Sequence, residues 1–253
     1  CVSDCKARQP DLTTFTGEDV TLPAEIHDFL RGQGWGGVRA TRTLGGGCIN
    51  KAVRIETEHG PYAILKTNHR TPPDLFAREA EGLRTLAGEE GPRVPAVYGY
   101  GDDWILIEYL SAAPRGEDYW ESMGAGLARL HSVTSTRFGF SHDNYIGSTP
   151  QQNPWETDGH TFFAEHRLRF QGRLAYRRKL LSIQDMKRLE RVISRLPQLV
   201  LAQPASLSHG DLWGGNSPAL LRWARLSPQV IHHDSICRYT HTILLWPVTV
   251  PRC

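Results

Sequence analysis

Hydrophobic and polar residues alternate along much of the first half of the chain. Val53 and Ile55 alternate with polar neighbours, and Ala63, Ile64 and Leu65 form a short apolar run. A two-residue period, or a short apolar run between turn residues, predicts a β-strand. We therefore expect a three-strand meander followed by two more short strands, at Val38–Leu44, Ile49–Glu56, Tyr62–Lys66, Val94–Tyr100 and Trp104–Leu110.

Other segments follow a helical period. Trp120, Met123, Leu127 and Leu130 recur every three or four residues, which is the stripe of an amphipathic helix. The stretch Phe138–Pro154 is rich in Gly, Ser, Asn and Pro and predicts a loop. The pattern predicts a β-rich half and then a mainly helical half, with helices at Pro23–Gln33, Asp74–Leu86, from Gly116 onward, His160–Leu174 and Gln184–Leu199.

Composition narrows the class of protein. The 253 residues carry 29 Lys and Arg against 27 Asp and Glu, a formal net charge of +2, which is no general signature of a nucleic-acid or membrane partner. No apolar run reaches the ~18–20 residues of a spanning helix. The five cysteines match no zinc or disulfide framework, and no signal peptide is visible. We expect a cytoplasmic protein.

The densest candidate chemistry lies between His209 and Asn216. Kinase catalytic loops contain an Asp and, five residues later, an Asn. Asp211 and Asn216 have this spacing, and Gly210, Gly214 and Gly215 would allow a tight, irregular backbone in this loop. In such a loop the Asp faces the attacking hydroxyl, and the Asn binds Mg²⁺ through its amide oxygen. A plain surface turn remains the alternative, because Asp, Asn and Gly all favour turns.

Lys66 and Glu79 form a second candidate pair. Lys66 ends the third predicted strand, where it would bind phosphate oxygens as a point charge. Glu79 lies between apolar positions of the following helix and could hold that lysine in place. Taken singly, each residue is more often a solvated side chain. Their order along the chain, before the Asp211 loop, favours a nucleotide site.

A glycine turn precedes this pair. The backbone amides of Gly45, Gly46 and Gly47, followed by Cys48, could approach phosphates without obstruction by side chains. The turn is neither a Walker A loop nor a G-x-G-x-x-G motif. By itself it is equally well explained as the turn of a hairpin.

Two further strings accompany these features, namely Asn144-Tyr145-Ile146-Gly147 with Pro150-Gln151 and Trp155, and the stretch Thr161–Leu168. With the segments already described, they resemble the fructosamine kinases, also called ketosamine 3-kinases, over residues 20–216. The resemblance implies an α+β, bilobal protein-kinase-like fold, similar to the aminoglycoside phosphotransferases. Its N-lobe would be an antiparallel sheet plus a helix, and its mainly helical C-lobe would be incomplete.

The resemblance also implies an activity. ATP would bind between the lobes, and its γ-phosphate would pass to the 3-hydroxyl of a ketosamine, a fructosamine or ribulosamine adduct on a protein or a free amine. The phosphorylated adduct falls apart, which makes this a deglycation reaction. By position, Asp211 would be the base, Asn216 a Mg²⁺ ligand, and Lys66 with Glu79 the phosphate-binding pair.

Further roles are implied for two short segments. Glu108, Tyr109 and Leu110 would be the hinge that meets adenine through backbone groups. Cys48 matches a cysteine of the family's glycine loop that is linked to redox-sensitive disulfide dimers, so the chain would be a monomer or a redox-linked dimer. An inert small residue in a turn is the alternative for Cys48.

The sequence changes character after Asn216. Residues 217–253 contain one acidic residue, Asp234, and no glycine. Asp234 is the remaining carboxylate that could serve as the second Mg²⁺ ligand, although it follows Asn216 at a longer distance than the family pattern suggests. We therefore divide the chain into a tail (1–20), an N-lobe (21–110), a C-lobe with the catalytic loop (111–216) and a divergent tail (217–253).

Two other functions remain open. The chain could be a catalytically impaired, truncated nucleotide-binding protein, or a related phosphotransferase that acts on an aminoglycoside, choline or another small alcohol. The residues Lys66, Asp211 and Asn216 would serve all of these acceptors equally.

Overall fold

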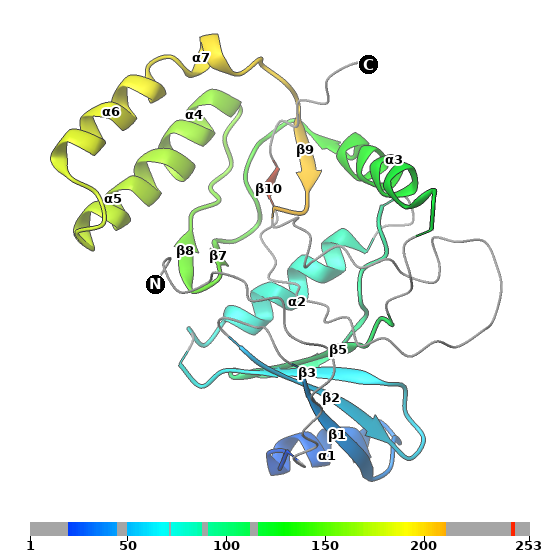
Figure 1. Ribbon diagram of the computed structural model, residues 1–253. Helices are drawn as coiled ribbons and strands as arrows, with labels where there is room; N and C mark the ends of the chain where they lie inside the picture. The colour runs from blue at the N-terminus through cyan, green and yellow to red at the C-terminus, as the bar shows by residue number, and fades with distance from the viewer. Residues whose placement is uncertain are drawn as a thin grey trace.

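Five antiparallel strands build the sheet of the first lobe, in the order β1-β2-β3-β5-β4 (Figure 1). The computed structural model describes residues 20–44, 50–70, 72–87, 91–111, 116–210 and 244–245. The strands are β1 (Val38–Leu44), β2 (Lys51–Thr57), β3 (Ala63–Thr67), β4 (Val97–Tyr100) and β5 (Trp104–Glu108). The predicted meander is therefore confirmed, and β5 lies between β3 and β4 in the sheet.

One helix covers each face of this sheet. Helix α1 (Ala24–Gly32) packs on the face that carries Leu65 and Leu106, and α2 (Leu75–Leu86) packs on the face that carries Ile64. Figure 1 shows the two helices on opposite sides of the strands. Side chains that alternate along a strand point to opposite faces, so the apolar run of β3 serves both layers.

The second lobe is mainly helical. Its helices are α3 (Tyr119–Ser132), α4 (Gly159–Phe163), α5 (Phe170–Arg177), α6 (Ile183–Ile193) and α7 (Leu196–Leu199), and a π-helical segment, Ala164–Arg169, joins α4 to α5. Its strands are β6 (Thr134–Ser135), β9 (Ala205–Ser208) and β10 (Leu244–Leu245), which form one sheet, and the hairpin of β7 (Asn144–Ile146) and β8 (Thr149–Gln151).

A shared core joins the lobes. Leu86, at the end of α2, packs with Leu130 of α3, Phe162 of α4 and Leu207 of β9. Each of these side chains is buried, and complete burial of such a side chain contributes about 1.5–3 kcal/mol. The end of α2 is therefore part of the second lobe's interior.

Three details differ from the sequence prediction. The stretch Phe138–Pro154 contains the β7–β8 hairpin, whose turn places Gly147 at φ +61°. The helix predicted at Gln184–Leu199 is divided into α6 and α7. Trp120 is 65% exposed, although its position in the helical stripe predicts burial. Three-residue strands are too short to produce a readable period, which explains why the hairpin was missed.

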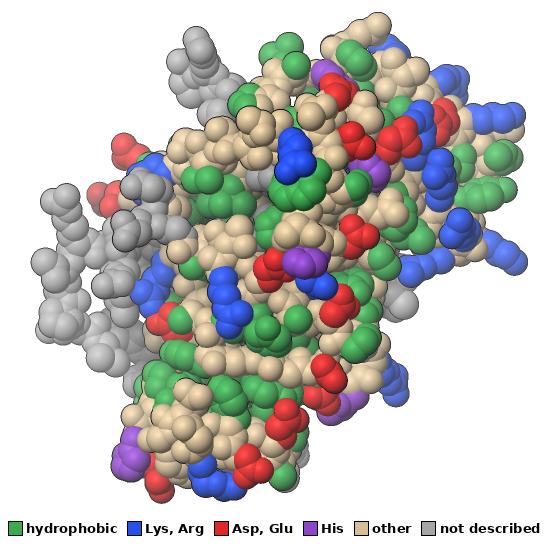
Figure 2. All heavy atoms as spheres, turned by 180° about the vertical axis from the view of Figure 1, so that it is seen from behind, with side chains coloured by type: hydrophobic (Ala, Val, Ile, Leu, Met, Phe, Trp, Pro, Cys, Tyr) green, Lys and Arg blue, Asp and Glu red, His purple; other side chains and the backbone are tan. Residues whose placement is uncertain are grey.

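Charged side chains gather on the surface of α5 and α6, where Figure 2 shows many Lys and Arg side chains with Asp and Glu among them. Arg169 of the π-helical segment pairs with Glu190 of α6 at 2.8 Å, and Arg188 pairs with Asp185 at 3.1 Å. These exposed pairs contribute little to stability and keep this face solvated. No helix among the described residues is long and apolar enough to span a bilayer.

Candidate active site

A buried ion pair joins β3 to α2. Lys66 Nζ lies 2.7 Å from Glu79 Oε1, and both side chains are 6% exposed. Lys66 stands opposite Ala52 of β2 and Ile105 of β5, so it shares their face of the sheet, beneath α2. The structure thus brings together the two residues that the sequence paired. A buried lysine ammonium held in place by a carboxylate is a point charge suited to phosphate oxygens.

The helical period explains why Glu79 faces the sheet. Phe76, Ala80 and Leu83 are fully buried against the strands, and Glu79 lies within the same stripe. A carboxylate in an apolar stripe must find a partner, because burying an unpaired charge is costly. The Lys66 ammonium meets this requirement.

Two of the three N–H groups of the predicted hinge, Glu108–Leu110, donate hydrogen bonds within the protein. The Glu108 N–H donates to Ala96 O at 2.8 Å, and the Tyr109 N–H donates to Tyr62 O at 3.1 Å. The side chain of Glu108 also accepts a hydrogen bond from Arg93. Within the described residues, the structure gives the Leu110 N–H no partner. The predicted hinge would meet adenine through backbone groups, and of its three N–H groups that of Leu110 is the one left for such a contact in this part of the chain.

The predicted catalytic loop begins where the description of the second lobe ends. Strand β9 leads to His209 and Gly210, and Figure 1 shows its arrow directed toward α2. Gly210 adopts φ +75°, a left-handed conformation that favours glycine. The remaining predicted site residues lie outside the described residues, namely Gly45, Gly46, Gly47, Cys48, Asp211, Asn216 and Asp234. The residues that are described contain no group of three or more His, Cys, Asp or Glu side chains that could hold a metal.

A buried polar cluster lies in the second lobe, at residues for which the sequence predicted no role. We define it as Asn144, Gln151, Asn153 and Arg167, each at most 8% exposed. Arg167 Nη2 donates to Asn153 Oδ1 at 2.6 Å, and Asn153 Nδ2 donates to Asn144 Oδ1 at 2.9 Å. Gln151 Nε2 donates to the same Asn144 oxygen at 3.0 Å. Burial lowers the pKa of Arg167 to about 10, well above neutral pH, so its guanidinium stays charged.

The setting of Arg167 is unusual in two ways. It lies in the π-helical segment, a rare turn that is frequent at functional sites. Its guanidinium carbon also lies 4.5 Å from the ring centroid of Phe162. Asn144, Gln151 and Arg167 belong to the two strings that carried the family resemblance, which was the one available signal for them, whereas Asn153 lies outside both strings.

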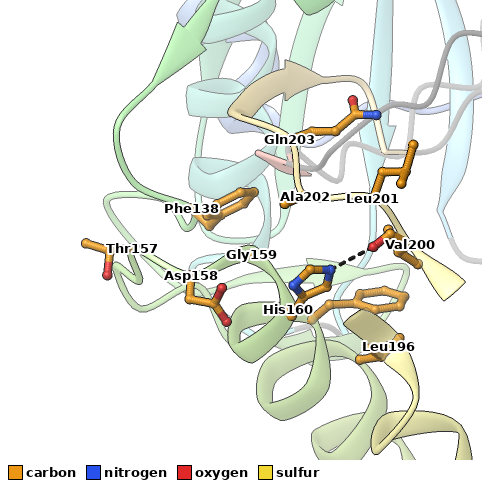
Figure 3. A pocket seen from close by; sticks show the side chains of 11 residues that line it. Phe138, Thr157, Asp158, Gly159, His160, Leu196, Val200, Leu201, Ala202 and Gln203 are labelled. Carbon is orange, nitrogen blue, oxygen red and sulfur yellow. Dashed lines mark hydrogen bonds between the residues drawn. The ribbon is translucent and has the colours of Figure 1, made fainter. Parts of the chain in front are cut away.

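Two of the cavities formed by described residues are lined by neither Lys66 nor Glu79. One, of about 130 Å³, lies at the start of β9 between Phe138, Leu196 and Leu201 (Figure 3). His160 Nε2 bonds Val200 O at 2.8 Å in its wall. The other lies beside α1 and includes Leu65, which is on the opposite face of the sheet from Lys66. Neither cavity therefore opens onto the Lys66–Glu79 pair.

Comparison with known proteins shows the family of this chain. Residues 31–241 match the family model for fructosamine kinase. The chain belongs to the fructosamine kinase family. Among curated proteins, it is 34% identical to the chloroplastic protein-ribulosamine 3-kinase of Arabidopsis thaliana, over 79% of this chain and 61% of that protein.

Solved structures agree with this assignment. A crystal structure of a fructosamine-3-kinase homologue from Thermobifida fusca matches with a TM-score of 0.67 and 30% identity, over 73% of this chain and 65% of that one. A thermostable mutant of aminoglycoside phosphotransferase APH(4)-Ia, in ternary complex with AMP-PNP and hygromycin B, matches with a TM-score of 0.50 and 15% identity, over 79% of this chain and 71% of that one. The fold is thus the α+β fold of the fructosamine kinases and aminoglycoside phosphotransferases.

The matches cover only part of the relatives. Across the first curated kinases, the aligned region spans between 54% and 63% of the relative's length. The family and the fold follow from these matches, and the activity of this chain is the subject of the proposal below.

Proposed function

We propose that the chain is an ATP-dependent phosphotransferase that phosphorylates the 3-hydroxyl of a ketosamine, as a step of protein deglycation. The observation that carries the proposal is the buried Lys66–Glu79 pair at 2.7 Å, beneath α2 in a chain of the fructosamine kinase family. The Arabidopsis relative is named a ribulosamine 3-kinase, which supports this class of acceptor. The AMP-PNP complex of the aminoglycoside phosphotransferase supports an ATP-type nucleotide.

Each residue has a defined part in the proposed reaction. Lys66 holds α- and β-phosphate oxygens, and Glu79 keeps the ammonium aimed at them. The Leu110 N–H donates to adenine. Asp211 accepts the proton of the attacking hydroxyl. Bound Mg²⁺, held by Asn216 and Asp234, would neutralise charge on the phosphates.

The glycine loop completes the proposed nucleotide site. The amides of Gly45, Gly46 and Gly47 would approach the phosphates, with Cys48 at the end of the turn. In this assignment residues 21–110 bind the nucleotide, and residues 111–216 supply the acceptor side and the catalytic loop. Residues 1–20 and 217–253 are the two tails, the second of which supplies Asp234.

The test is transfer of labelled phosphate from ATP to a ribulosamine and a fructosamine, with Mg²⁺ and with EDTA, by the full chain. Asp211→Asn should abolish transfer and leave ATP binding largely intact. Asp102→Asn makes the same chemical change in the exposed β4–β5 turn and should leave transfer unchanged. Equal loss in both variants, or normal turnover by Asp211→Asn, would refute the assignment of the base.

The acceptor assay also separates the alternatives. Transfer to an aminoglycoside or choline, without transfer to ketosamines, would replace the proposed substrate class. Thermal stabilisation by ATP without transfer to any acceptor would select a nucleotide-binding protein that has lost catalysis.

A further inference from the structure

The flank of α2 that faces the second lobe carries two carboxylates. Asp74 precedes the first residue of the helix, and Glu81 lies two turns later, about 10 Å along the axis at 1.5 Å per residue. Arg78 lies between them, with Nε 3.2 Å from Asp74 Oδ2 and Nη1 3.4 Å from Glu81 Oε2. These three residues form one row along the helix, distinct from the row that contains Glu79.

Both carboxylates accept hydrogen bonds from one short segment of the second lobe. Tyr145 Oη donates to Asp74 Oδ1 at 2.7 Å. Ser141 Oγ donates to Glu81 Oε1 at 2.8 Å, and His142 Nδ1 lies 3.1 Å from the same oxygen. Hydrogen bonds to charged acceptors are about twice as strong as neutral ones. Residues 141–145 thus contact α2 at both its first turn and its middle.

The Tyr145–Asp74 hydrogen bond is less exposed to solvent than the Ser141–Glu81 hydrogen bond. Its ring packs against the core formed by α2 and the sheet. Burial and the neighbouring Asp74 raise the pKa of Tyr145 to about 12, so the phenol remains a protonated donor. The hydrogen bond from Tyr145 lowers the pKa of Asp74, so this carboxylate remains a charged acceptor at neutral pH.

Asn153 of the buried polar cluster holds residues 141–145 in turn. Asn153 Nδ2 donates to His142 O at 3.0 Å, and the Asn153 N–H donates to Asp143 Oδ1 at 2.8 Å. Arg167 in turn donates to Asn153 Oδ1. A continuous set of hydrogen bonds therefore runs from the π-helical segment, through residues 141–145, to α2.

We propose that residues 141–145 position α2, and through it Glu79, so that Lys66 is aimed at the nucleotide phosphates. Tyr145 and Ser141 are positioning residues in this scheme. Two contacts about 10 Å apart fix both the rotation and the tilt of the helix. Neighbouring helical positions point in directions ~100° apart, so the direction of Glu79 depends on the rotation of α2 about its axis. A rotation of the helix would therefore turn Glu79 away from Lys66. The inference rests on the proposed function in so far as Lys66 binds phosphates.

The experiment compares three variants of the full chain. Tyr145→Phe removes one hydroxyl and keeps the packed ring, and Ser141→Ala removes an exposed hydroxyl. Tyr176→Phe, on the exposed surface of α5, is the matched control. Two quantities are measured: the hydrogen exchange of the α2 amides without nucleotide, and the Kd for a fluorescent ATP analogue with Mg²⁺.

Tyr145→Phe should weaken nucleotide binding about tenfold, the effect of one hydrogen bond to a charged acceptor. Ser141→Ala should have a smaller effect in the same direction, and the α2 amides should exchange faster in both variants. In a Glu79→Gln background, Tyr145→Phe should cause no further loss of affinity, because Tyr145 acts through Glu79. A merely structural role would leave the two losses additive.

Exchange and affinity in Tyr145→Phe equal to those of Tyr176→Phe would overturn the inference, as would additive losses in the Glu79→Gln background. If the unaltered chain binds no nucleotide, the proposed function fails for this chain. The exchange of the α2 amides, measured without nucleotide, then still decides whether residues 141–145 position the helix.

Discussion

Substitutions in the Lys66–Glu79 pair should affect the free energy of unfolding and the affinity for nucleotide in different ways. Both side chains are 6% exposed, so removing one charge leaves the other buried. Breaking a buried pair in this way costs about 3–5 kcal/mol of unfolding free energy. In a chain of this size, 1 kcal/mol corresponds to about 2–4 °C in Tm, so Lys66→Met and Glu79→Leu should each lower Tm by roughly 6–20 °C.

The double variant separates the two effects. Buried ion pairs replaced by apolar residues of similar volume are often neutral or more stable by about 1–4 kcal/mol. Lys66→Met with Glu79→Leu should therefore recover most of the stability lost in either single variant. Nucleotide affinity should stay lost in all three variants, because each lacks the ammonium or the carboxylate that aims it.

The assay is thermal and urea unfolding, both monitored by circular dichroism, with titration of a fluorescent ATP analogue at equal protein concentration. Glu190→Gln is the control, since it breaks the exposed pair with Arg169 and should cost less than about 1 kcal/mol. Additive destabilisation in the double variant, or nucleotide affinity restored along with stability, would refute the reasoning.

Three further outcomes are expected. Asp158→Ala removes the side chain that caps α4 through the Thr161 N–H and should cost about 1 kcal/mol in urea unfolding. That hydrogen bond lowers the pKa of Asp158, so its contribution should be present above pH ~4 and lost as acid protonates it. Gly210→Ala, at φ +75°, should cost about 1–2 kcal/mol in the same assay. Cys48→Ser should abolish any disulfide dimer on a non-reducing gel.

The first lobe could be predicted closely because its pattern is local. Apolar runs and turn residues defined all five strands, with errors of a few residues at their ends. Lys66 and Glu79 could be found because each is a charged residue at an otherwise apolar position. A charge at such a position must be paired on folding, and the fold offers each one the other.

The buried polar cluster could not be predicted from the same principles. Asn144, Gln151 and Asn153 lie in a stretch rich in Gly, Ser and Pro, where polar residues are normally exposed. They are buried because their side-chain amides bond one another, and because Arg167, from the π-helical segment later in the chain, donates to Asn153 Oδ1. A partner that distant in sequence leaves no periodic signal. The resemblance to a family therefore marked Asn144 and Gln151, and no signal marked Asn153.

Helix α2 contributes to two interiors at once. Phe76, Ala80 and Leu83 pack on the sheet, whereas Leu86 packs with α3 and β9. A large swing of one lobe relative to the other would have to pull the helix out of one of these packings, at a cost of several buried side chains. ATP should therefore enter and leave with little domain closure, and small-angle scattering should give the same radius of gyration with and without nucleotide.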